Sequence, residues 1–214
     1  MKRLLPLAAL LLVGLAPAAF AQVVELTPSI RYVTGDDIEL GSGATVPGDL
    51  HIQQNVGWGV SLGFASNPNM TFEGQFGYQG SRLDFKPLAG NTVTIFDMTQ
   101  YRIMGNFLFS KPGMSEDTQP YFLLGLGSLI FDPDNDAFDS IGKFSWQIGL
   151  GVKHQFKSSM GIRLQALYMP TYLTSEPYGY WCDPYYGCYT SSDYHYLNQF
   201  DFSLGLTKRF GTYR

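Results

Sequence analysis

From about residue 22 onward, the sequence alternates apolar and polar side chains with a period of two. The clearest run has Phe144, Trp146, Ile148, Leu150, Val152 and Phe156 at even positions, with Lys, Ser, Gln and Gly at the odd ones. Successive side chains of a β-strand point to opposite faces of the sheet, so this period indicates strands. The same pattern recurs near residues 24–32, 58–64, 70–78, 101–109, 122–130, 162–172 and 200–210. We therefore predict an all-β chain with eight strands.

The expected connections alternate in length. Long ones are predicted at 35–56, 81–96, 131–142 and 173–197, and shorter ones at 65–69, 110–119 and 157–160. This is the pattern of an antiparallel up-and-down barrel with turns at one rim and loops at the other. Strands of about 10 residues are long enough to cross a bilayer at a tilt.

Period two alone does not say which face of the barrel is apolar, and a soluble lipocalin-like barrel would place that face inside. Two features favour an apolar outer face. The polar positions are mostly Gly, Ser, Thr and Gln, which suit a narrow lumen filled by side chains. The aromatic residues also fall at two levels, as a lipid-facing barrel requires. One level holds Phe64, Phe72, Phe109, Phe122, Phe156 and Phe210, and the other Tyr32, Trp58, Tyr78, Trp146, Tyr168 and Tyr172, with Phe200 nearby.

Composition agrees with a membrane barrel. Only 15% of the residues are charged, against about 25% in soluble domains, while the mean hydropathy of −0.05 does not fit a bundle of membrane helices. The net charge of −4 argues against nucleic acid as a partner.

Lys2 and Arg3 precede an apolar run that ends before a small-x-small pattern at Ala21. We predict a signal peptide at 1–21 and one barrel domain at 22–214; a single-span anchor would need a longer apolar run.

Four loose motifs carry a family resemblance. They are Glu25-Leu26-Thr27-Pro28, the segment from Gln119 to Gly127, the segment from Phe144 to Lys153, and the closing segment from Gln199 to Phe210. With them the chain resembles the small outer-membrane β-barrel proteins of Gram-negative bacteria, including the OmpA-like, OmpX-like and OmpW-like barrels. The resemblance implies an outer-membrane location, with periplasmic termini and extracellular long loops. It also implies that the barrel-assembly machinery reads Phe210, although four residues follow it.

Charged residues at inward positions form a predicted lumen cluster. Its members are Glu25, Arg31, Glu73, Arg102, Lys153, Arg163, Asp201 and Arg209. A buried charge is costly unless it is paired, so we expect ion pairs that plug the barrel. In particular, Glu25, Glu73 and Asp201 should pair with Arg163, Arg102 and Arg209 in some combination. The alternative is a gated ion path.

Two long loops carry further candidate features. Cys182 and Cys188 are expected to form a disulfide, the default for a close pair in an exported protein. The surrounding loop at 173–197 is rich in Tyr and Trp, which suits contact with an external ligand. The same rings could instead rest on lipid headgroups or on the barrel mouth. The other loop, at 131–142, carries four acidic residues: Asp132, Asp134, Asp136 and Asp139. They form either a solvated acidic loop or a divalent-cation bridge to lipopolysaccharide.

No pattern of residues points to catalysis, a cofactor or a metal centre. His195 lies near Ser191, Ser192 and Asp193, but a catalytic triad is defined by geometry that a sequence does not supply. We expect a non-enzymatic outer-membrane barrel with a structural or surface-interaction role. Its expected partners are outer-membrane lipids, lipopolysaccharide, the assembly machinery during insertion, and an external ligand at loop 173–197. The alternatives are a narrow channel for small apolar or ionic solutes and an enzyme that modifies lipid A.

Overall fold

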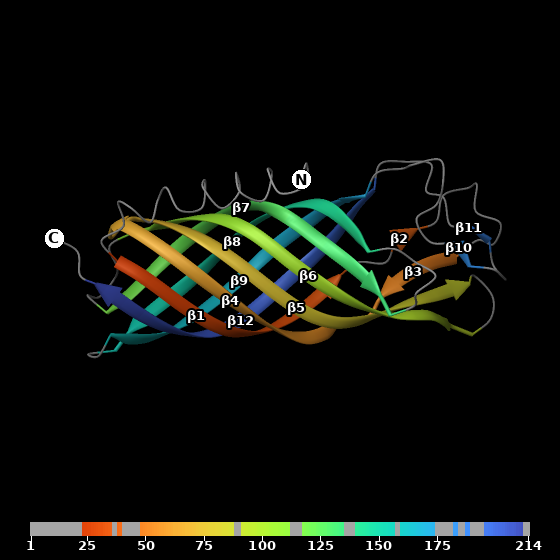
Figure 1. Cartoon of the computed structure of the whole chain (residues 1–214), viewed down its shortest axis with the longest axis horizontal. Coiled ribbons are helices and arrows are strands. Elements are labelled where there is room, and N and C mark those ends of the chain that lie inside the picture. The colour runs from red at the N-terminus through yellow and green to blue at the C-terminus, as the bar shows by residue number, and fades with distance from the viewer. Residues whose placement is uncertain are drawn as a thin grey trace, which may run out of the picture.

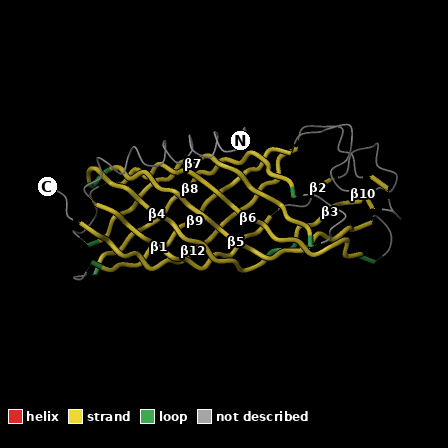
Figure 2. Tube along the Cα trace, viewed as in Figure 1, coloured by secondary structure: helices red, strands yellow, loops and turns green. Residues whose placement is uncertain are grey.

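The computed structural model describes residues 23–35, 38–39, 48–87, 91–111, 117–134, 140–156, 159–173, 182–183, 187–188 and 195–211. The predicted signal peptide lies outside this part of the chain. Within it, no helix has the length and apolar character needed to cross a bilayer. Figure 2 shows that strands make up nearly all of the described trace.

Eight long antiparallel strands close into a barrel, as the alternation predicts (Figure 1). Each pairs with its neighbours in the chain, β5 pairs with both β4 and β6, and the first strand closes the barrel by pairing with the last. The eight are β1 (Val23–Gly35), β4 (Asn55–Asn67), β5 (Met70–Pro87), β6 (Val93–Ser110), β7 (Thr118–Pro133), β8 (Ile141–Gln155), β9 (Met160–Leu173) and β12 (His195–Gly211). A closed ladder satisfies the backbone hydrogen bonds of every strand, which a bilayer requires.

The two ends of the barrel differ. We call the end where β1 begins and β12 finishes the turn end, and the opposite end the loop end. Four short strands lie at the loop end in Figure 1: β2 (Ile38–Glu39), β3 (Gly48–Ile52), β10 (Cys182–Asp183) and β11 (Gly187–Cys188). The backbone ladder of β10 and β11 places Cys182 opposite Cys188. The side chains of these two residues lie outside the described set, so the disulfide stays a prediction.

One expected loop proves to be mostly strand. The segment 81–96 was predicted as a long connection, yet β5 and β6 stay paired from Ser81↔Met98 to Phe85↔Val93. Strand β3 adds to the free side of β5 from Gly48↔Pro87 to Ile52↔Leu83. The outward apolar pattern ends near residue 80, although the strand continues, because the apolar residues change faces. Leu83 and Phe85 point inward, whereas the apolar residues earlier in β5 point outward.

The outward face is apolar along the middle of the barrel. Leu150 is 66% exposed and Ile30 is 65% exposed, values that a soluble protein would not repeat over a continuous belt. Aromatic rings flank this belt at both levels. Near the turn end, Phe109 and Phe122 have ring centres 6.5 Å apart, and near the loop end Trp58 stacks on Tyr78 at 5.5 Å. The outward face is therefore suited to hydrocarbon with headgroups above and below.

Candidate functional site: the charged lumen and its apolar mouth

The inward side chains fill the barrel with polar groups over most of its length. All eight residues of the predicted charge cluster point into the lumen, and the structure joins them in three groups along the axis. Each group contains one carboxylate and takes at least one partner from a strand across the barrel. From the turn end to the loop end, the three groups are those of Glu25, Glu73 and Asp201.

The Glu25 group lies nearest the turn end. Glu25 on β1 accepts hydrogen bonds from Lys153 on β8 and from the Arg209 guanidinium on β12, whose Nη2 lies 3.0 Å from its Oε1. Glu25 and Lys153 are buried, while the Arg209 side chain is 21% exposed. Two cations thus share one carboxylate, with one of them close to the rim.

The Glu73 group spans the full width of the lumen. Glu73 on β5 pairs with Arg163 on β9, which stands opposite in the strand order, and it also accepts a hydrogen bond from Asn106 at 3.2 Å. Arg163 Nε donates to the hydroxyl of Tyr121 at 2.7 Å, and that hydroxyl donates to Gln165 at 2.9 Å. The Lys153 ammonium lies 5.7 Å from the centre of the Tyr121 ring, so this ring separates the Glu25 and Glu73 groups.

Amides connect the Glu73 group to the centre of the barrel. The amide nitrogen of Gln147 donates to Asn106 at 2.6 Å and to Gln75 at 3.0 Å. Both Asn106 and Gln147 are fully buried. Because Asn106 also donates to Glu73, the hydrogen-bond network is continuous from the carboxylate to Gln75.

The Asp201 group lies further toward the loop end. Oδ2 of Asp201 on β12 accepts hydrogen bonds from Arg31 Nε at 2.8 Å and from Arg102 Nη1, the latter reaching across from β6. None of the three side chains is more than 5% exposed. The next contact toward the loop end joins two amides, with Gln199 Nε2 3.4 Å from Gln100 Oε1.

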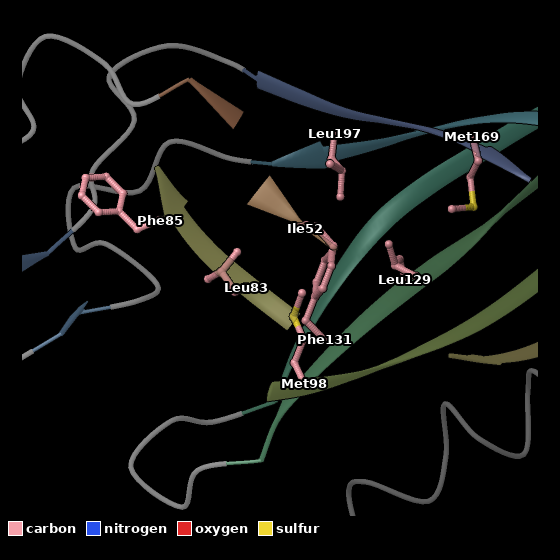
Figure 3. Packing of buried hydrophobic residues seen from close by; sticks show 8 residues of the cluster. All are labelled: Ile52, Leu83, Phe85, Met98, Leu129, Phe131, Met169 and Leu197. Atoms are coloured by element: carbon pink, nitrogen blue, oxygen red, sulfur yellow. The ribbon is translucent and has the colours of Figure 1, made fainter. Parts of the chain in front are cut away.

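Beyond these amides the lumen becomes apolar. Eight buried residues from β3, β5, β6, β7, β9 and β12 pack together in what we call the mouth cluster, shown in Figure 3: Ile52, Leu83, Phe85, Met98, Leu129, Phe131, Met169 and Leu197. A second, smaller group packs within the barrel: Leu108, Tyr121, Leu123 and Leu167. Hydrocarbon therefore fills the lumen at the loop end, and charges and amides, with this smaller apolar group, fill the rest of it.

The mouth cluster is not among the residues expected from the sequence, although the sequence contains a signal for it. In β7 the outward apolar residues are even-numbered, but Leu129 and Phe131 are odd-numbered and point inward. The same change of parity occurs at Met98 in β6 and at Leu197 in β12. Such a change marks the level at which an apolar interior replaces a polar one.

The lumen is tightly filled. Two small cavities inside it have volumes of about 10 Å³ each, close to the space of one water molecule. Glycines provide some of the space for the large side chains. A Cβ at Gly151 would lie 2.2 Å from Cζ of Tyr121, and one at Gly77 would lie 3.1 Å from Nη1 of Arg31. Within the part of the chain that the structure describes, large side chains therefore fill the lumen at these two levels.

The other predicted features lie at the rims or outside the described side chains. Phe210 points outward near the turn end, pairs with Val24 and is 51% exposed. In the predicted acidic loop, Asp132 accepts a hydrogen bond from Ser140 at 2.6 Å, while Asp136 and Asp139 lie outside the described residues. No group of His, Cys, Asp or Glu suited to a metal ion occurs in the described ranges.

A charged pair also lies outside the lumen, on the part of β5 and β6 beyond the loop-end aromatic rings. Arg82 Nε donates to Asp97 at 2.8 Å, and both side chains are well exposed. The hydrogen bond and the charge of Asp97 raise the pKa of the Arg82 guanidinium. This pair, unlike the ion pairs of the lumen, is therefore exposed to solvent.

Comparison with known proteins supports the same architecture. The family model of the outer membrane protein beta-barrel domain matches residues 6–210. The chain belongs to this family. Members of the family are proteins of the outer membrane, which places this chain in the bacterial outer membrane as a transmembrane barrel.

Solved structures of the same architecture are similar in fold and distant in sequence. The outer membrane protein OprG of Pseudomonas aeruginosa has a TM-score of 0.65 and 13% identity, with 90% of this chain and 97% of that chain covered. Neisserial surface protein A has a TM-score of 0.53 and 11% identity, with 88% and 96% covered. OprH of P. aeruginosa has a TM-score of 0.50 and 18% identity, with 87% and 99% covered. A search of curated proteins finds no match.

Proposed function

We propose that the protein is a closed, non-enzymatic outer-membrane barrel that acts through its external surface. The termini face the periplasm and the loop end faces the outside. Outer-membrane lipids and lipopolysaccharide surround the apolar belt, and the assembly machinery reads Phe210 during insertion. In this proposal the barrel is a rigid support, and recognition belongs to the loops that it carries.

The observation that supports this proposal is the filled lumen. Three groups of ion pairs and a layer of amides cross the barrel, and the cavities among them hold about one water each. An eight-stranded barrel has an interior only wide enough for side chains. Opening a path would separate buried charges from their partners, which is energetically costly.

Planar-bilayer recording tests whether the lumen is closed. Refolded protein, with insertion verified by the mobility difference between unboiled and boiled samples, should add no conductance steps to a bilayer in 1 M KCl. The matched control is the triple variant Glu73→Ser, Arg163→Ser, Tyr121→Ser, which lacks the side chains at the centre of the Glu73 group. Its recording shows whether a barrel with a loosened lumen conducts under the same conditions. Regular conductance steps from the wild type would refute the closed lumen.

The mouth cluster favours a second candidate function, the passage or binding of a small apolar solute. Its eight residues form a buried layer of hydrocarbon between the loop end and the polar part of the lumen. Xenon under pressure is a suitable apolar probe, because it occupies cavities lined by Leu, Met and Phe. An anomalous peak beside Leu129 and Met98 in pressurised crystals would support this function, and its absence would leave the cluster as packing alone.

The disulfide belongs to the proposed external surface. With Cys182 opposite Cys188 in the β10–β11 ladder, the backbone register is that of two cross-strand partners. Alkylation without reductant should leave both residues unmodified, and alkylation after reduction should modify both. The bond would stiffen loop 173–197, so reduction should increase proteolysis of this loop without unfolding the barrel. Ready alkylation of the untreated protein would contradict the bond.

A further inference from the structure

The Asp201 group contains more positive than negative charge. One carboxylate accepts hydrogen bonds from two guanidiniums, those of Arg31 and Arg102. The other two carboxylates of the lumen cluster, Glu25 and Glu73, belong to separate groups, and among the described residues neither arginine forms another ion pair. The Glu73 group, by contrast, has one cation for one anion, and the Glu25 group has its second cation at the rim. An excess charge at this depth requires compensation.

Donors from this group remain without partners beside one of the small cavities. Arg31 Nη1, Arg102 Nε and Gln100 Nε2 are buried and have no hydrogen-bond partner among the described residues. All three residues line the same cavity, which we call the arginine cavity. Three buried acceptors are also without a hydrogen-bond partner among the described residues, but none of their residues lines this cavity: Asp201 Oδ1, Gln199 Oε1 and Gln147 Oε1.

The remaining walls set the size and polarity of the arginine cavity. Val33 and Leu129 are buried and apolar, and Gly57 and Gly77 contribute only backbone. Tyr78 and the buried, polar Gln79 complete the lining. A Cβ at Gly77 would lie 3.1 Å from Arg31 Nη1, so glycine leaves room for the guanidinium at this wall. The volume of about 10 Å³ admits a single atom or one water and excludes sulfate, phosphate and carboxylates.

We propose that the arginine cavity binds one monovalent, halide-sized anion, which is chloride in ordinary salt. The anion accepts charge-assisted hydrogen bonds from the two guanidiniums and one from the Gln100 amide. It balances the excess charge of the Asp201 group in a site that Leu129 of the mouth cluster shields from the loop end. The low dielectric constant of this interior strengthens the attraction. The site stabilises the barrel and needs no solute to pass through it.

Bromide is the direct probe because it scatters anomalously. Wild-type protein is refolded and crystallised in NaBr, and data are collected at the bromine edge. A peak between Arg31 and Arg102 is expected. In solution, the thermal unfolding midpoint should rise with chloride and saturate, and it should stay lower in gluconate of equal ionic strength, because gluconate is too large for the cavity.

Two variants separate this site from a general salt effect. Arg102→Gln removes the excess charge and should abolish the difference between chloride and gluconate. Lys153→Gln, which removes a cation from the Glu25 group, should retain that difference. Equal wild-type midpoints in the two salts together with no bromide peak would overturn the proposal and assign the cavity to water. A chloride effect that persists in Arg102→Gln would also overturn it. If a variant fails to fold, the bromide map and the chloride–gluconate comparison of the wild type still test the proposal.

Discussion

Replacing Glu73 with Gln tests the ion pair at the middle of the lumen. The side chains of Glu73 and Arg163 are only 3% and 4% exposed, so the substitution leaves a buried guanidinium without its carboxylate. Two neutral acceptors remain for Arg163, the Tyr121 hydroxyl and the Gln165 amide oxygen. Removing one partner of a buried pair costs about 3–5 kcal/mol. We expect the lower part of that range because the two neutral acceptors remain.

Equilibrium unfolding in guanidinium chloride, followed by tryptophan fluorescence in detergent micelles, measures this effect. A loss of about 3 kcal/mol corresponds to at least about a hundredfold change in the unfolding equilibrium. Asp97→Asn, which breaks the exposed pair with Arg82, is the matched control and should leave stability unchanged within error. The double variant Glu73→Leu, Arg163→Met should recover most of the loss, because an apolar pair needs no compensating charge.

The assignment of stability to this ion pair would be refuted if Glu73→Gln unfolded at the same denaturant concentration as the wild type. If the free energy of unfolding recovers in the double variant, the loss in Glu73→Gln comes from the unpaired charge and not from a loss of packing volume. If the double variant were less stable than Glu73→Gln alone, the pair would contribute through shape rather than through charge.

Further predictions concern the outward face and the lumen wall. Leu150→Arg places a charge in the middle of the apolar belt and should cost about 2–4 kcal/mol in the same unfolding assay; no loss would mean that this position does not face lipid. Gly151→Ala should lower the temperature at which the folded band disappears on gels, because a Cβ there would lie 2.2 Å from a ring carbon of Tyr121. Gly74→Ala is its control, since nothing lies within 4 Å of that Cβ.

The sequence predicted the strands and their inward and outward faces because both depend on local alternation. In β8, each even-numbered residue from Phe144 to Val152 was assigned outward, and the exposed fractions of Phe144, Leu150 and Val152 agree. The chain does not carry as clear a signal for where a strand ends. Strands β5 and β6 extend beyond the predicted lipid band. There the apolar residues lie on the inward face, so the end of the outward apolar pattern does not mark the end of the strand.

The arrangement of the charges could not be read from the sequence. Alternation places Asp201, Arg31 and Arg102 inside, but which of them meet depends on the stagger of β12, β1 and β6 around the closed barrel. That stagger is set by pairing over the whole sheet. For the same reason, the sharing of Asp201 between two arginines, and the cavity beside them, became visible only in three dimensions.

The most direct test of the whole arrangement is the accessibility of successive positions along one strand. Nitroxide labels are placed singly at residues 145–148 and 150 of β8, in a background with Cys182→Ser and Cys188→Ser. Collision with oxygen dissolved in the bilayer is then measured by electron paramagnetic resonance. High accessibility at 146, 148 and 150 and low accessibility at 145 and 147 is the predicted result. The inverse pattern, or no period of two, would contradict a barrel with lipid outside and a filled polar lumen inside.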